Sequence, residues 1–280
     1  MGILNVTPDS FSDGGQYSDL KAALVRVEQM LSDGAAIIDV GGESTRPAGA
    51  AYGDGAQPIA GEEERRRVLP IIEAIVTRFP EAIISIDTYR PSTARAALQA
   101  GAHVVNDVYG QCPDEPEDST VSIAAEFGAP LVVMHAGKSH QTATHHDSAD
   151  DLVADVIEHL KGRAAEALQS NVNHVILDPG IGFGKGVAGD IALISTTADL
   201  VRLGHPVMVG ISRKRTAAAI LGYEPDNGPV PVTDRLFGSL GLTAAAVVRG
   251  ASIVRTHDVK PTVELLKALT AVPSHALAEA

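Results

Sequence analysis

Short, nearly continuous runs of apolar residues alternate along the chain with longer segments in which apolar residues recur every three or four positions. The short runs predict β-strands that are buried on both faces, because a half-exposed strand would alternate apolar and polar residues. Eight strands are predicted, over residues 2–6, 35–40, 82–87, 103–106, 131–134, 174–178, 206–210 and 252–255.

The longer segments predict helices between these strands. Asp19 is expected to cap the first helix, in which Leu20, Leu24 and Val27 share one apolar face. Pro70 is expected to kink the second helix or to mark a late start, because proline lacks the amide hydrogen that a helix interior uses. The predicted helices cover residues 19–31, 62–79, 91–100, 121–127, 149–169, 190–203, 214–221, 234–249 and 261–269.

Eight strands that alternate with helices predict an α/β fold, a single-domain (β/α)8 TIM barrel over residues 1–270 with a flexible tail over 271–280. A doubly wound open sheet is the weaker alternative, because eight regular units without a break in composition favour closure. The chain begins at the first predicted strand, so it is also consistent with one part of a longer polypeptide.

Composition narrows the class of protein. Aromatic residues make up only 4% of the chain, so the core is expected to consist of Val, Ile, Leu and Ala. The net charge of -13 argues against general nucleic-acid binding. Cys112 is the only cysteine, which excludes an intrachain disulfide and predicts a reducing, cytoplasmic location. No apolar run is long enough to cross a membrane.

Polar residues stand where the predicted strands end. In a barrel these positions face one mouth, where active sites are built, although any single one could instead cap a helix. Carboxylate and amide groups there can bind a heterocycle rich in hydrogen-bond donors, and cations can bind an anion such as phosphate. Asp39 is expected to be structural and Lys185 to be solvated. The strand-end set is Asn5, Asp87, Asn106, Asp178, Lys214, Arg255 and His257.

The chain contains seven signatures, and all but the second include members of this set: 5–15, 41–47, 86–88, 106–107, 178–185, 212–214 and 255–258. In this order they resemble dihydropteroate synthase over nearly the whole chain, and the first two together are the most specific. The resemblance implies a pterin-binding barrel that joins 4-aminobenzoate to a dihydropterin carrying a CH₂-diphosphate and releases diphosphate. It also implies Mg²⁺, small-molecule substrates and a homodimer.

The resemblance implies a role for each site residue. Four residues would hold the pterin ring, with Phe183 lining the pocket: Asp87, Asn106, Asp178 and Lys214. Three would bind the diphosphate, with the first also reaching Mg²⁺: Asn5, Arg255 and His257. Two mobile loops would close over the site and form the aminobenzoate pocket, the first with Phe11 and Asp13 and the second with Thr45, Arg46 and Pro47. The catalytic residues would be Asp13, Arg46, Lys214, Arg255 and His257.

Several features of the chain depart from the pattern of that family. Arg215 and Thr216 follow Lys214 where a small and a bulkier apolar residue are common, and residues 48–58 lengthen the second loop. Two other functions therefore remain open at this point. One is a pterin-dependent methyltransferase on the same barrel, and the other is a non-catalytic pterin-binding paralogue.

Overall fold

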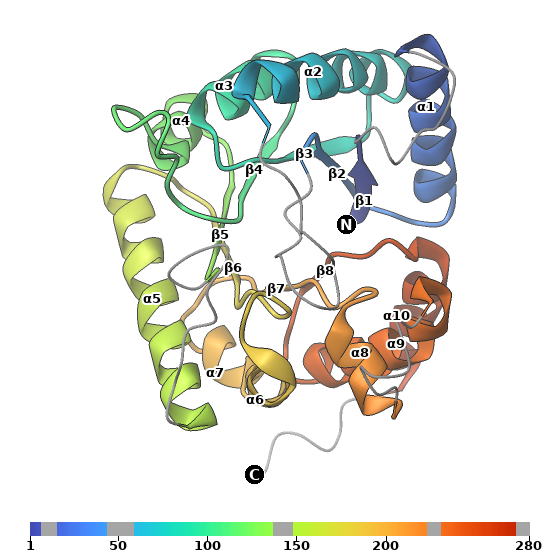
Figure 1. Cartoon of the computed structure of the whole chain (residues 1–280), viewed down its shortest axis with the longest axis vertical. Coiled ribbons are helices and arrows are strands. Elements are labelled where there is room, and N and C mark those ends of the chain that lie inside the picture. The colour runs from blue at the N-terminus through green and yellow to red at the C-terminus, as the bar shows by residue number, and fades with distance from the viewer. Residues whose placement is uncertain (7–15, 44–58, 137–147, 223–230, 273–280) are drawn as a thin grey trace.

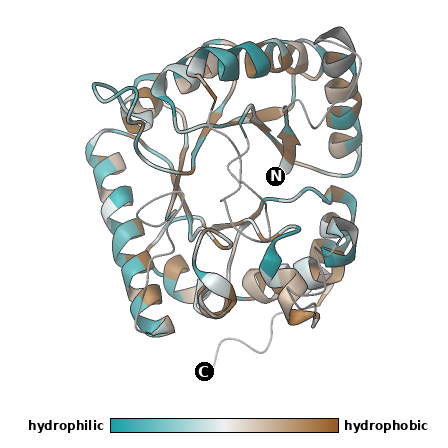
Figure 2. Ribbon diagram, viewed as in Figure 1, coloured by the Kyte–Doolittle hydropathy of each residue, from teal (hydrophilic) through white to brown (hydrophobic). Residues whose placement is uncertain are grey.

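Strands and helices alternate along the chain in the computed structural model, which describes residues 1–6, 16–43, 59–136, 148–222 and 231–272. The strands form a ring and the helices lie outside it (Figure 1). Apolar residues concentrate on the strands, and polar residues are most frequent on helices such as α2 and α5 (Figure 2). This is the arrangement that the alternating pattern predicted.

The strands are all parallel and follow chain order. Six form one sheet: β1 (Gly2–Asn5), β2 (Ile37–Gly41), β3 (Ile83–Asp87), β4 (Val104–Asp107), β5 (Leu131–Met134) and β6 (Val175–Asp178). The last two, β7 (Met208–Val209) and β8 (Ile253–Val254), pair with each other. Backbone hydrogen bonds from Leu177 to Pro206 (2.9 Å) and from Ile3 to Thr256 (3.0 Å) join the two groups. The sheet therefore closes on itself, and the predicted barrel is confirmed.

The helices surround the ring at the predicted places, with shifted ends. Their bounds are α1 (Gln16–Ser32), α2 (Gly61–Arg78), α3 (Pro91–Gln99), α4 (Thr120–Phe127), α5 (Ala149–Gln169), α6 (Gly186–Ser195), α7 (Thr197–Val201), α8 (Arg215–Ile220), α9 (Leu236–Val247) and α10 (Val259–Ala271). A 3₁₀ turn at Val232–Arg235 precedes α9. Of the predicted tail, residues 273–280 lie outside the described residues.

Two helix predictions were wrong, and a late start of the second helix is excluded. The first helix begins at Gln16, so Asp19 lies inside it and is not its cap. The second helix starts at Gly61, one residue before the predicted start, so Pro70 lies inside it and does not mark its beginning. Three glutamates in its first turn favour the positive end of the helix dipole. The predicted helix 190–203 divides at Thr196, whose hydroxyl donates to the Ala192 carbonyl (2.8 Å) and competes with the regular backbone bonds.

A buried ion network joins the ends of β2 and β3 to the start of α2. The Arg90 guanidinium, 2% exposed, donates to Glu43 (2.7 Å) and to Glu64 (3.1 Å), and Glu64 is itself buried. It also donates to the Ile59 carbonyl (2.6 Å) and to the Tyr89 hydroxyl (2.6 Å). Burial raises the pKa of Glu64. Arg90 thus ties together residues on either side of segment 44–58.

Replacing Arg90 should destabilise the fold strongly. Arg90→Met leaves two carboxylates without their cation in a buried place, and we expect the free energy of unfolding to fall by about 3–5 kcal/mol in urea titrations. The matched control is Arg78→Met, which breaks the exposed pair with Glu28 (2.7 Å) and should cost under about 1 kcal/mol. Equal losses in the two variants would contradict the importance of the buried network.

Candidate active site

The carboxyl ends of the strands bring the predicted polar residues to one end of the ring. Asp87 ends β3, Asn106 lies next to the end of β4, and Asp178 ends β6. All three side chains are buried, at 6% exposed or less. Because buried polar groups need partners, their contacts indicate what this end of the barrel can bind.

Arg255 connects two strands of this cluster. Its Nε donates to Asp39 Oδ2 and its Nη2 to Asp87 Oδ2, both at 2.6 Å. Asn106 Nδ2 donates to the same Asp39 oxygen at 3.1 Å. Asp39 is therefore the structural group that the sequence led us to expect. Arg255, assigned to an anion-binding set, also contacts Asp87 of the ring-binding set, so the two predicted halves of the site are physically joined.

Two acceptors of this cluster have no hydrogen-bond partner within the described part of the chain. They are Asp87 Oδ1 and Asn106 Oδ1, and both are buried. Burial raises the pKa of Asp87 to about 7, although Arg255 opposes the rise. Unpaired buried acceptors are costly, and a ligand that presents N–H donors would satisfy them.

Lys214 follows β7 at the same end of the barrel. Its Nζ donates to the Ile181 carbonyl and stands 4.6 Å from the centre of the Phe183 ring. Burial lowers the pKa of Lys214 to about 8, and the charge of Asp178 opposes the shift. Asp178 Oδ1 accepts the Gly180 N–H (2.7 Å), while burial raises the pKa of its carboxyl group. The structure thus gathers a cation, an aromatic face and several acceptors around one place, which suits a flat polar ring.

A glycine-rich turn builds this wall of the site. Gly180 has φ 66°, and a Cβ there would lie 2.0 Å from the His135 carbonyl oxygen. Lys185 is buried and donates to the carbonyls of His135 (2.8 Å) and Gly180 (2.9 Å). The expectation that Lys185 is solvated was therefore wrong. The tight turn directs carbonyl groups inward, and they need a donor.

Thr216, one of the departures from the family pattern, also supports this turn. Its hydroxyl donates to Asp190 Oδ2, and Asp190 Oδ1 accepts the Gly182 N–H at 2.8 Å. Thr216 is buried and its hydroxyl bonds to α6. The polar residue at this position therefore has a local structural partner.

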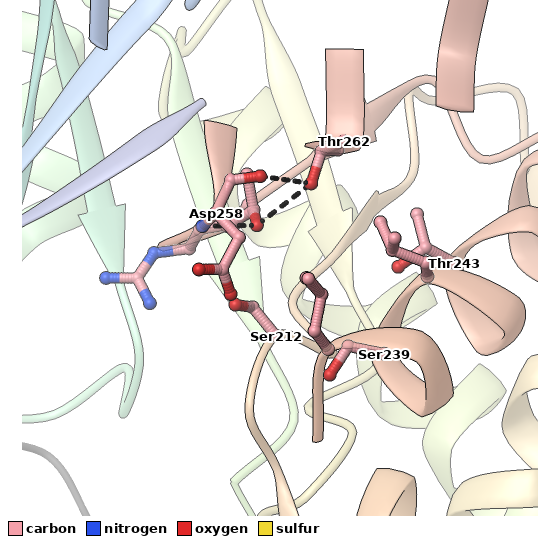
Figure 3. Close-up of a pocket in the computed structure, with 9 residues that line it drawn as sticks. Ser212, Ser239, Thr243, Asp258 and Thr262 are labelled. Carbon is pink, nitrogen blue, oxygen red and sulfur yellow. Dashed lines mark hydrogen bonds between the residues drawn. The ribbon is translucent and has the colours of Figure 1, made fainter. Parts of the chain in front are cut away.

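His257 contacts the hydroxyl group of Ser212 on the neighbouring turn. Its Nδ1 is 3.2 Å from the Ser212 hydroxyl, which also accepts the His257 backbone N–H at 3.1 Å. Behind them lies a cavity of about 10 Å³, the size of one water, whose lining includes Ser239 and Thr243. Figure 3 shows Thr262 across from Ser212 and Ser239. Its hydroxyl donates to the Thr256 hydroxyl and to the Asp258 carbonyl, both in the turn after β8. These contacts support the strand end that carries Arg255 and His257.

Asn5 is the last predicted site residue among the described ones. Asn5 ends β1, is half-buried and is aligned with Gly41 of β2. No group of three or more His, Cys, Asp or Glu side chains arranged for a metal occurs among the described residues.

None of the helices in the described ranges is long and apolar enough to span a membrane. Five predicted site residues lie outside the described residues: Phe11, Asp13, Thr45, Arg46 and Pro47.

Comparison with known proteins decides the family. The model of the pterin binding enzymes matches residues 1–257. A dihydropteroate synthase of Streptococcus pyogenes serotype M6 is 42% identical over 272 residues, which cover 96% of this chain and 94% of the relative. The chain belongs to the dihydropteroate synthase family. The resemblance inferred from its signatures is confirmed.

Solved structures of this family agree in fold. The Clostridium difficile dihydropteroate synthase, solved in the presence of pteroic acid, aligns with a TM-score of 0.83 at 34% identity, over 96% of this chain and 94% of that chain. The Xanthomonas albilineans enzyme with 4-aminobenzoic acid gives 0.83 at 37% identity, over 97% and 93%. The mouth described above therefore lies in a barrel shared with members of this family.

One pair near the site was not predicted. Arg213 and Asp258 form a two-bond ion pair, at 2.7 and 3.0 Å, between the turn after β7 and the turn after β8. The sequence did contain a sign of this pair, because residues of opposite charge stand in the signatures 212–214 and 255–258. Sequence alone does not tell which of several nearby charges such residues choose.

The raised pKa of Asp87 predicts a pH effect on stability. Its folded-state pKa of about 7 exceeds the ordinary 3.8, so its contribution is fully present below about pH 4 and is lost as the pH rises through 7. Relative to Asp87→Asn, which cannot titrate, the wild type should lose on the order of 1–3 kcal/mol between pH 5 and 8 in urea titrations.

The control for this experiment is Asp118→Asn. A hydrogen bond from Ser122 lowers the pKa of Asp118, so its contribution is constant above pH 5 and is lost only in more acidic solution. Parallel stability curves for wild type and Asp87→Asn between pH 5 and 8 would contradict the shift at Asp87.

Proposed function

We propose that the protein acts as a dihydropteroate synthase. It condenses (7,8-dihydropterin-6-yl)methyl diphosphate with 4-aminobenzoate, giving 7,8-dihydropteroate and diphosphate in folate biosynthesis. This proposal is carried by two buried acceptors that have no partner among the described residues, Asp87 Oδ1 and Asn106 Oδ1, in a chain of this family. Relatives solved with pteroic acid and with 4-aminobenzoic acid support the substrate class.

The pterin ring fits the chemistry of the buried cluster. Its amino and ring N–H groups are donors for Asp87, Asn106 and Asp178, whereas its ring acceptors suit Lys214. Phe183 contributes a flat apolar wall beside the Lys214 ammonium. The three acceptors are held by strand ends and the other two groups by the turns after β6 and β7, so little rearrangement is needed when the ring binds.

The diphosphate is assigned to Arg255, His257 and Asn5. Arg255 already balances two carboxylates, so additional positive charge is needed for the leaving group. Mg²⁺ commonly binds through one or two protein oxygens together with substrate phosphates and water, and the Asn5 amide oxygen suits that role without a preformed cluster. When bound, Mg²⁺ would neutralise charge that develops on the departing diphosphate.

The reaction needs no covalent enzyme intermediate. Breaking the C–O bond to diphosphate leaves a cationic pterin methylene, and the amine of 4-aminobenzoate attacks that carbon and then loses a proton. We assign Asp13 to stabilise the cation, and Phe11, Thr45, Arg46 and Pro47 to the aminobenzoate side. These assignments rest on the family signatures. We also propose that residues 1–270 form the catalytic unit and that it works in the cytoplasm, consistent with the free thiol of Cys112.

The decisive test is an assay of diphosphate release. Wild-type protein with Mg²⁺ should release diphosphate and form 7,8-dihydropteroate only when both substrates are present, and a chelator should abolish the reaction until Mg²⁺ is restored. Lys214→Ala should raise the Kd for the pterin substrate at least about tenfold, because it removes a charged hydrogen-bond donor. The exposed Lys161→Ala is its control.

Other outcomes of this assay have defined meanings. Tight binding of the pterin diphosphate without turnover would identify a non-catalytic paralogue. Methyl transfer from methyltetrahydrofolate without diphosphate release would identify a methyltransferase. Unchanged pterin affinity in Lys214→Ala would remove that residue from the ring-binding set.

We also propose a homodimer that uses α9. This helix is apolar on nearly every side, yet Phe237 is 79% exposed and Val248 just beyond its end is also exposed. Ile220 and Leu221 are exposed on the neighbouring α8 and its end. A helix that is apolar all round is normally covered, and a second copy of the chain would cover this one.

Phe237→Glu should therefore convert a dimer to a monomer. Light scattering coupled to size-exclusion chromatography would measure the change in mass, because a buried charge at the contact opposes association. Phe127→Glu on α4 is a matched control that should leave the mass unchanged. A monomeric wild type would overturn the proposed dimer.

A further inference from the structure

The turn that presents Lys214 has an unusual backbone. The Lys214 N–H donates to the Ile211 carbonyl (3.2 Å), which closes a four-residue turn. Its third residue, Arg213, has φ 62°, in the left-handed region that such turns usually give to Gly or Asn. A non-glycine residue keeps this conformation only where surrounding contacts hold it.

Four contacts hold Arg213 in this conformation. Its N–H donates to the Ser239 hydroxyl (3.0 Å), and its carbonyl accepts from Arg235 (2.9 Å). Its guanidinium donates to both carboxylate oxygens of Asp258, at 2.7 and 3.0 Å. That hydrogen-bonded pair raises the pKa of Arg213 and lowers the pKa of Asp258.

Asp258 lies on the next turn of the barrel, three residues after Arg255 and one after His257. The strands that lead into the two turns are the shortest of the barrel, with two paired positions, Met208 with Ile253 and Val209 with Val254. So short a ladder constrains the direction of the following turns weakly. The Arg213–Asp258 pair adds a side-chain connection beyond the end of the ladder.

We propose that Arg213 is a positioning residue, and that its pair with Asp258 holds the Lys214 ammonium against Phe183 and the pterin ring. The pair also connects the turn of Lys214 to the turn that carries Arg255 and His257. This inference rests on the proposed function and deepens it, since neither Arg213 nor Asp258 is among the residues assigned to the substrate. The geometry of the fork is required, so lysine at position 213 cannot replace arginine.

The test measures binding of a dihydropterin without diphosphate by calorimetry, at a temperature where circular dichroism shows every variant folded. Arg213→Lys and Asp258→Asn should each raise its Kd about tenfold, within the range for residues of one hydrogen-bond network. Arg213→Gly should do the same while remaining folded, because glycine readily adopts the positive φ of this position.

A second arm separates positioning from general support of the fold. In a Lys214→Ala background, Arg213→Lys should cause no further loss of affinity, because the effect acts through Lys214. The control is Arg95→Lys on the outer surface, where one guanidinium nitrogen of Arg95 donates to both carboxylate oxygens of Glu126 (2.6 and 2.7 Å). This control should leave the Kd unchanged.

Each result decides the inference. Unchanged affinity in Arg213→Lys, or an equal loss in the Lys214→Ala background, overturns the positioning role alone. Failure of the wild type to bind any dihydropterin overturns the proposed function, and the inference with it. A loss confined to variants with an intact Lys214 supports it.

Discussion

The Arg255 guanidinium lies between the carboxylates of Asp39 and Asp87, and the mouth of the barrel is organised around it. Two buried acidic groups on adjacent strands would repel each other without a cation between them. One oxygen of Asp87 has no partner in the part of the chain that the structure describes, and Asp39 in turn accepts from Asn106. The charge balance of the barrel and its capacity to bind a donor-rich ring therefore arise from one arrangement.

Glycine and lysine residues set the opposite wall of the site. The positive φ at Gly180 allows its turn to approach the His135 carbonyl, and Lys185 binds the carbonyl groups that the turn directs inward. Lys214 can then lie across Phe183. Lys185 thus satisfies carbonyl groups of the turn. Lys214 donates to one carbonyl and also places its charge beside the Phe183 ring.

Much of the fold followed from the sequence, because strands buried on both faces leave a strong apolar signal and parallel closure puts all their ends at one mouth. That reasoning placed Asp87, Asn106 and Asp178 together. It did not predict which cation binds Asp87. Arg255 is 168 positions away along the chain, and any other cation at a strand end could have bound that carboxylate. It also missed the burial of Lys185 and the division between α6 and α7. Both depend on which backbone carbonyls lack partners, which no residue pattern records.

The closure of the ring has a consequence for how the protein forms. The bond between Ile3 and Thr256 joins the first strand to the last, and such distant contacts form slowly because a long loop must close first. Until β8 docks, Asp39 and Asp87 lack the cation that lies between them in the folded barrel. During synthesis on the ribosome, most of the chain can therefore emerge and begin to fold before any pterin site exists. A complete binding site therefore requires the last strand to be in place, because Arg255 follows it directly.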